Sequence, residues 1–231
     1  MARGVRGAAS TSILRGPSWY NSGKAIQHGP KLPAEKQPMS YTPQILAFAG
    51  SARKDSWNKK LVRIAADGAR AAGASVSLIE LDDFPLPLFN QDDESEHGLG
   101  ENARKLKDLM LSHQGFLISS PEYNSSITPL LKNTIDWTSR SAPGEAPLAC
   151  FAGKTAVLMS ASPGALGGMR ALVHARAILG NIGTLVLPGT ISISKAHEAF
   201  AQDGSLKDKN QQQRVEQLGA ELVAFLRKHH A

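Results

Sequence analysis

The sequence predicts an α/β protein built on one doubly wound parallel sheet of five strands, with helices on both faces. Short apolar runs alternate with amphipathic helical patterns along most of the chain, which is typical of successive strand–helix–strand units. Two strand-to-helix corners are rich in small and polar residues, as expected of ligand-binding loops in such sheets. With 231 residues, 42% hydrophobic and 20% charged, the chain suits one ordinary domain of this class.

Each expected strand is a short apolar run bounded by polar or turn-forming residues. The last strand is expected to break at Pro188-Gly189 and to resume over 191–193, because proline donates no ladder hydrogen bond. The five expected strands cover residues 44–49, 75–81, 115–120, 154–160 and 184–187.

The expected helices have recognisable starts and stops. Apolar side chains recur at helical spacing over 58–72 until Gly73 ends the pattern. Pro129 suits the first position of a helix, and Thr128 can cap it. The last helix is expected to follow Ser205 as its cap. Further helices are expected over 101–112 and from the Gly-rich turn 162–168 to about 179, and 82–100 is expected to be a long loop.

The loop Gly50–Asn58 joins the first strand to the first helix and is suited to hold a phosphate. Small residues let the backbone approach an anion, and the helix directs free N–H groups and partial positive charge toward it. It has neither a Walker nor a GxGxxG pattern. We expect Arg53 to supply the positive charge, with Ser51, Ser56 and Asn58 as neutral donors. Ser56 and Asn58 also suit ordinary helix capping.

Two further corners belong to the same edge of the sheet. Pro121-Glu122-Tyr123-Asn124-Ser125 follows the third expected strand, and Ser160 to Gly168 follows the fourth. Open parallel sheets bind ligands beyond the carboxyl ends of their strands, where the strand order reverses. We therefore expect the corners after strands one, three and four to border one crevice.

These motifs resemble those of a known family. Gly50-Ser51-x-Arg53-x-x-Ser56-x-Asn58, Pro121-Glu122-Tyr123-Asn124 and Leu131-Lys132-Asn133-Thr134-Ile135-Asp136-Trp137 together resemble the NADPH-dependent FMN reductase family, particularly its quinone and chromate reductase branch. Matches at Asp83–Asp92 and Ser160–Gly164 extend the resemblance over residues 43–228. It implies a flavodoxin-like sheet of order 2-1-3-4-5.

The resemblance implies FMN as a non-covalent cofactor and NADPH or NADH as co-substrate. The flavin carries the hydride chemistry, so no catalytic side chain and no metal site are expected. The corner at Pro121 would lie along the isoalloxazine edge, and Glu122 would mainly hold this loop or a neighbouring subunit. The residues implied to bind the cofactor are Ser51, Arg53, Ser56, Asn58, Pro121, Glu122, Tyr123, Asn124, Ser125, Ser160, Pro163 and Gly164.

The implied activity is NAD(P)H-dependent reduction of a small-molecule acceptor, namely a quinone, chromate or flavin, in ping-pong half-reactions. A homodimer or homotetramer is also implied, with Leu131–Trp137 and Met169–His174 as interface candidates. The chain departs from the family pattern at Ser125, where an aromatic is common, and at Thr128-Pro129, where Pro-Gly is usual. A flavodoxin-like electron carrier and a flavin-binding protein without turnover are the alternatives, although carriers of that kind have Thr-rich phosphate loops and acidic surfaces.

The charge distribution separates the N-terminal segment from the rest. Residues 1–38 hold six basic residues and one acidic residue, and so carry five of the six net positive charges. Nucleic-acid binding is therefore not expected of the domain. We expect residues 1–40 to be a disordered or transit-like basic extension, with a translation start at Met39 as a further alternative, and 41–231 to be the reductase domain.

The remaining composition points to the cytoplasm. Cys150 is the only cysteine and lacks a partner for an internal disulfide, which fits a reducing compartment. No apolar run is long enough to span a membrane, so no membrane association is expected. The transit-like composition of the first 40 residues leaves an organelle as the alternative location.

Overall fold

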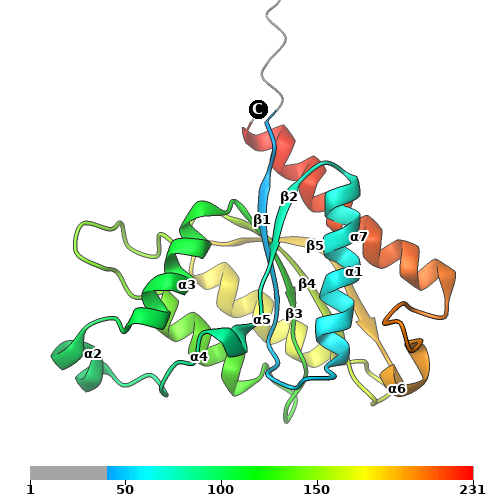
Figure 1. Ribbon diagram of the computed structural model, residues 1–231, viewed down its shortest axis with the longest axis horizontal. Helices are drawn as coiled ribbons and strands as arrows, with labels where there is room; N and C mark the ends of the chain where they lie inside the picture. The colour runs from blue at the N-terminus through cyan, green and yellow to red at the C-terminus, as the bar shows by residue number, and fades with distance from the viewer. Residues whose placement is uncertain (1–40, 231) are drawn as a thin grey trace, which may run out of the picture. The chain divides into compact units, whose positions relative to one another are not determined.

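The computed structural model describes residues 41–230, so the expected N-terminal extension lies outside the described residues. The described chain forms a five-stranded parallel sheet of order β2-β1-β3-β4-β5 (Figure 1). This confirms the flavodoxin-like topology expected from the sequence. The strands are β1 Gln44–Ala49, β2 Ser75–Leu78, β3 Gly115–Ser119, β4 Thr155–Ala161 and β5 Leu185–Ile193.

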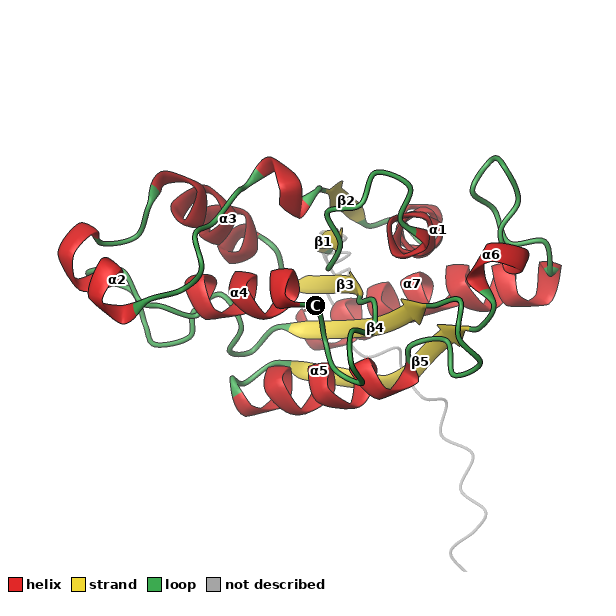
Figure 2. Cartoon of the chain, turned by 90° about the horizontal axis from the view of Figure 1, so that it is seen from below, coloured by secondary structure: helices red, strands yellow, loops and turns green. Residues whose placement is uncertain are grey.

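Helices cover both faces of this sheet. Figure 2 shows β3, β4 and β5 running in the same direction, with α5 alongside β4 and β5. No helix within residues 41–230 combines the length and apolarity needed to cross a membrane. The main helices are α1 Trp57–Ala71, α3 Glu101–Ser112, α4 Pro129–Thr138, α5 Met169–Asn181 and α7 Lys209–His230, and the short ones are α2 Gln91–His97, α6 Ala196–Ala199 and a 3-10 turn over Leu81–Asp83.

Two apolar cores lie on opposite faces of the sheet, because successive strand side chains point to opposite sides. Ile45 and Ala47 of β1 pack in the core formed with α1 and α7. Leu46 and Phe48 of the same strand pack in the core formed with α3, α4 and α5. The central strands β1, β3 and β4 are buried on both faces, so they appear in the sequence as continuous apolar runs.

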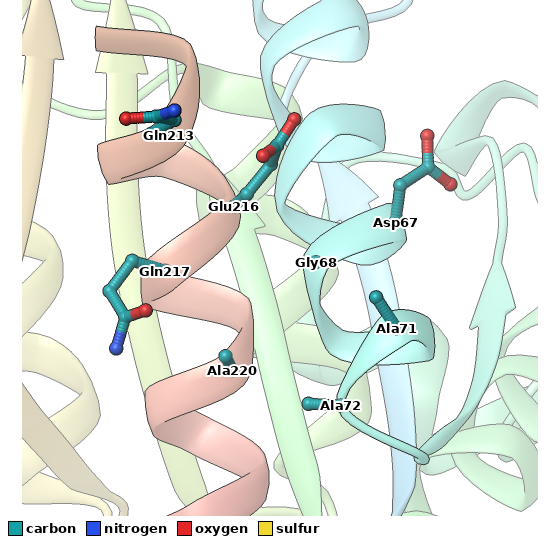
Figure 3. Close-up of a pocket in the computed structure, with 8 residues that line it drawn as sticks. All are labelled: Asp67, Gly68, Ala71, Ala72, Gln213, Glu216, Gln217 and Ala220. Atoms are coloured by element: carbon teal, nitrogen blue, oxygen red, sulfur yellow. The ribbon is translucent and has the colours of Figure 1, made fainter. Parts of the chain in front are cut away.

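Two glycines bring α1 and α7 into backbone contact. A Cβ atom at Gly68 would lie 2.1 Å from the Glu216 carbonyl oxygen, and one at Gly219 would lie 2.0 Å from that of Ala65. Figure 3 shows the open pocket of about 800 Å³ beside this contact, bordered by small residues such as Ala71 and by polar side chains. This pocket adjoins the C-terminal half of α1, whereas the carboxyl ends of the strands lie near the N-terminus of that helix.

Several elements differ from expectation, and β2 ends at Leu78, three residues before its expected end. β5 continues through Pro188, because a register shift against β4 absorbs the irregularity on this edge strand. α7 begins at Lys209 rather than soon after Ser205, since the Asp208 carboxylate accepts the N–H groups of the first turn. The expected loop at 82–100 contains the short polar helix α2.

Candidate cofactor site

A cavity of about 80 Å³ lies at the carboxyl ends of β1, β3 and β4. The strand order reverses here, because β1 has β2 on one side and β3 on the other. The three expected corners meet around it, and eight of the twelve residues expected to bind a cofactor line it. The lining residues are Ser51, Arg53, Ser56, Trp57, Asn58, Pro121, Glu122, Tyr123, Ala161, Ser162 and Pro163.

The N-terminus of α1 opens into this cavity without a side-chain cap. Ser56 occupies the N-cap position and is buried, yet its hydroxyl makes no capping hydrogen bond within the described chain. The first turn contains no acidic residue. Among residues 41–230, the buried Ser51 hydroxyl accepts only a long hydrogen bond of 3.4 Å from the Arg53 N–H. Free helix N–H groups beside two hydroxyls are suited to bind an anion.

Arg53 is exposed and is the cation among the residues that line the cavity. Its Cζ lies 5.5 Å from the centroid of the Trp57 ring, within the range of a cation–π contact. Trp57 packs partly against the core and also lines the cavity. The indole thus supports the guanidinium at the cavity edge.

Asn58 is buried and bonded to two strand ends. Its Oδ1 accepts hydrogen bonds from the Ser119 hydroxyl at 2.8 Å and the Ala161 N–H at 2.9 Å, and its Nδ2 donates to the Ala161 carbonyl at 2.8 Å. Asn58 therefore does not cap α1, and most of its hydrogen-bonding capacity is already used.

The second corner is a tight hairpin. Tyr123 and Ser126 exchange two backbone hydrogen bonds of 3.0 Å, and Asn124 and Ser125 have φ values of +49° and +66°. Positive φ at both central residues is characteristic of a type I′ turn. Tyr123 lines the cavity and is 48% exposed, whereas Asn124 and Ser125 at the tip do not line it.

Glu122 binds the start of α5. Its carboxylate accepts hydrogen bonds from the Arg170 backbone N–H at 3.1 Å and from the Arg170 Nε at 2.7 Å. Desolvation raises the pKa of Glu122, but hydrogen bonds and the charge of Arg170, with backbone N–H groups, outweigh it and lower the pKa overall. Glu122 is therefore ionised at neutral pH and is poorly suited to act as a general acid.

The third corner places a glycine against a buried hydroxyl. Ser160 is fully buried, and its Oγ has no hydrogen-bond partner among residues 41–230. Gly168 has a φ of +90°, and a Cβ atom there would lie 1.8 Å from this Oγ. Ser160 and Gly164 do not line the cavity, although both were expected to bind the cofactor, whereas Pro163 does.

Three lining residues were not among those expected: Trp57, Ala161 and Ser162. Ala161 and Ser162 lie within the Ser160–Gly164 motif. The motif therefore located this corner of the site but did not indicate which of its residues line the cavity. Trp57 was not expected to line the cavity, because an aromatic side chain in the first turn of a helix more often packs on the neighbouring protein surface.

Comparisons with known proteins identify the family of this chain. The family model described as NADPH-dependent FMN reductase matches residues 43–198. A probable NADPH:quinone oxidoreductase of Oryza sativa is 31% identical over 185 residues, covering 79% of this chain and 88% of that protein. An NAD(P)H-dependent FMN reductase of Pseudomonas aeruginosa is 32% identical over 192 residues, covering 82% and 98%.

A solved structure extends this similarity to three dimensions. The flavoenzyme FerB of Paracoccus denitrificans, an NAD(P)H:(acceptor) oxidoreductase, has a TM-score of 0.67 and 27% identity, covering 81% of this chain and 99% of that one. The chain belongs to the NADPH-dependent FMN reductase family, whose cofactor is FMN and whose electron donor is NAD(P)H.

Proposed function

We propose that this protein uses NAD(P)H to reduce a small-molecule acceptor, with FMN bound where the three corners meet. The observation that carries the proposal is the uncapped N-terminus of α1, which opens into the same cavity as the corner Pro121–Tyr123. A phosphate site and a platform for a flat ring are thereby brought together. FMN contains both a phosphate group and a flat isoalloxazine ring.

The residues present fit FMN better than FAD. The loop before α1 offers two hydroxyls, helix N–H groups and Arg53, which suit one phosphate group. No second Gly-rich pyrophosphate pattern precedes a helix in the sequence. Ser51, Ser56 and Arg53 would hold the phosphate.

The other two corners would hold the ring. Pro121–Tyr123 and Ala161–Pro163 line the cavity, and their backbone groups would orient the isoalloxazine and shield it from water. When bound, FMN supplies the redox chemistry, namely uptake of a hydride from NAD(P)H and release of two electrons to the acceptor in a second half-reaction. No side chain of this chain is assigned a proton-transfer role.

The rim of the cavity favours a flat, partly apolar acceptor. Tyr123 is half exposed there, and Leu166 and Met169, which do not line the cavity, are exposed in the turn after β4 and at the start of α5. Quinones match this surface, and the Oryza relative is named for a quinone activity. Chromate and free flavin are the other candidate acceptors, and ping-pong turnover follows if donor and acceptor use this rim in turn.

We also propose that the protein is a homodimer or homotetramer. Met169 and Val173 lie one helical turn apart on α5 and are 51% and 63% exposed, and an apolar helix face of this kind is suited to a second copy.

The proposed domain is residues 41–231. The buried Cys150 has no cysteine partner in the sequence, which is consistent with a cytoplasmic location.

Steady-state oxidation of NADPH and of NADH tests the activity. Each donor is supplied with the flavin-loaded protein alone, then with a benzoquinone, chromate or free FMN. We expect rapid oxidation that depends on the acceptor, with parallel double-reciprocal lines. A protein that binds flavin but shows no turnover with any acceptor is an electron carrier or a non-catalytic flavin-binding protein.

A further inference from the structure

The side chain of Asn58 connects all three corners of the site. It belongs to the first turn of α1, and its amide bonds to Ser119 at the end of β3 and to Ala161 at the end of β4. The partners lie 61 and 103 positions away in the sequence. A single side chain therefore fixes the helix that follows the phosphate loop against the two strands that precede the other loops.

The bonds to Ala161 replace part of a strand. The ladder between β3 and β4 ends at the pair of Ser119 and Met159, two residues before Ala161. The chain then leaves β3 at Pro121, which has no N–H to donate. The Asn58 amide supplies both an acceptor and a donor to the backbone of Ala161, as a neighbouring strand would. The end of β4 is thereby held in place as its loop departs.

Asn58 has little capacity left for a ligand. Its residue surface is 3% exposed. A side-chain amide has two donor hydrogens and two acceptor lone pairs, and protein groups occupy three of these four. A phosphate accepts hydrogen bonds, so a single Nδ2 hydrogen is all that Asn58 could offer it.

We propose that Asn58 is a positioning residue that sets the spacing between the phosphate loop and the two loops flanking the flavin ring. This inference rests on the proposed function and assigns Asn58 no essential contact with the phosphate. The two roles have different signatures. Loss of a phosphate ligand weakens binding of FMN but not of riboflavin, which lacks the phosphate. Loss of the spacing weakens binding of both flavins and changes the environment of the ring.

The test compares FMN and riboflavin titrations of the apoprotein, followed by flavin fluorescence, and the midpoint potential of bound FMN at saturation. For Asn58→Ala we expect both dissociation constants to rise about tenfold, equivalent to about 1.4 kcal/mol, with their ratio unchanged and the potential shifted. Arg53→Ala serves as the comparison, because it removes a residue proposed to bind the phosphate. It should raise the dissociation constant of FMN but not that of riboflavin, and it should leave the midpoint potential unchanged.

Ser119→Ala provides a second route to the same answer. It removes one bond to the Asn58 Oδ1, at a residue that does not line the cavity. We expect a smaller rise in both dissociation constants, in the same ratio, and a smaller shift of potential. If Asn58→Ala does not fold, this variant alone decides.

Thr184→Val is the matched control for lost stability. The buried Thr184 hydroxyl donates to the Phe151 carbonyl at 3.0 Å, at the amino ends of the strands and away from the site. It should lower the melting temperature but leave both dissociation constants and the potential unchanged.

If the wild type binds FMN, either of two results overturns this inference and leaves the proposed function standing. In the first, Asn58→Ala weakens the binding of FMN but not of riboflavin and leaves the midpoint potential unchanged. In the second, Asn58→Ala changes the dissociation constant of neither flavin. A wild type that binds no flavin overturns the proposed function, and this inference with it.

Discussion

Glu122 in the loop after β3 holds Arg170 at the start of α5 through the backbone and the side chain at once. A second tie follows one helical turn later, where the His174 Nδ1 lies 2.8 Å from the Ser126 hydroxyl. The hairpin Tyr123–Ser126 is therefore attached to α5 at both ends. This places Tyr123 at the cavity rim without requiring the hairpin to pack in the core.

We predict that Glu122→Gln lowers stability by about 1–2 kcal/mol at neutral pH, the usual worth of a charged helix cap. The neutral amide loses the charge that binds Arg170 and the N-terminus of α5. Urea unfolding of wild type and variant measures the difference. Glu101→Gln is the control, because its partner Lys105 is exposed on the same helix and such pairs contribute little.

The effect of Glu122→Gln should also depend on pH. The pKa of Glu122 is lower in the folded protein than in the unfolded chain. Its contribution is therefore complete above its unfolded pKa of about 4.3 and is lost as pH falls through the folded pKa. Unfolding measured below that range should show wild type and variant converging. A constant difference down to the lowest pH at which both fold would argue against the charge as the cause.

We predict that Ser125→Gly stabilises the protein by about 0.5–1 kcal/mol. Ser125 has a φ of +66°, a conformation that costs an L-residue about 1–2 kcal/mol, partly offset by the greater entropy of glycine in the unfolded chain. Thermal unfolding measures the gain. Ser125→Ala keeps the unfavourable φ and should give none, so equal gains from both would disprove this explanation.

We predict that Gly168→Ala destabilises by more than about 2 kcal/mol, because it combines positive φ with a clash. The added Cβ would meet the Ser160 hydroxyl. Ser160→Ala removes an unpartnered buried hydroxyl and should leave stability unchanged or slightly raised. In the double variant the loss should be smaller than the sum of the two changes. Strict additivity in this cycle would mean that the two residues do not clash.

We predict that Arg53→Ala weakens FMN binding by about 1.5–3 kcal/mol, the worth of a hydrogen bond to a charged group. The apoprotein should remain as stable, because Arg53 is exposed and its contact is with the surface of Trp57. Flavin titration measures the loss. Lys54→Ala, an exposed neighbour outside the cavity lining, is the control, and an equal loss there would indicate only long-range attraction.

The sheet could be predicted because its central strands β1, β3 and β4 are buried on both faces and appear as continuous apolar runs. The start of α7 and the presence of α2 could not, since Asp208 and Ser205 are both suitable caps and α2 buries no residue. In the site, sequence motifs located the corners. The role of Asn58 depends on contacts with Ser119 and Ala161 that only the folded chain creates.

Identification of the bound cofactor tests the central claim most directly. The purified protein is denatured, and the released cofactor is identified by mass and quantified against the chain, after reconstitution with FMN and FAD together if it is isolated colourless. The geometry of one phosphate site beside one ring platform predicts FMN at about one molecule per chain. FAD as the bound species, or no flavin retained after reconstitution, would contradict it.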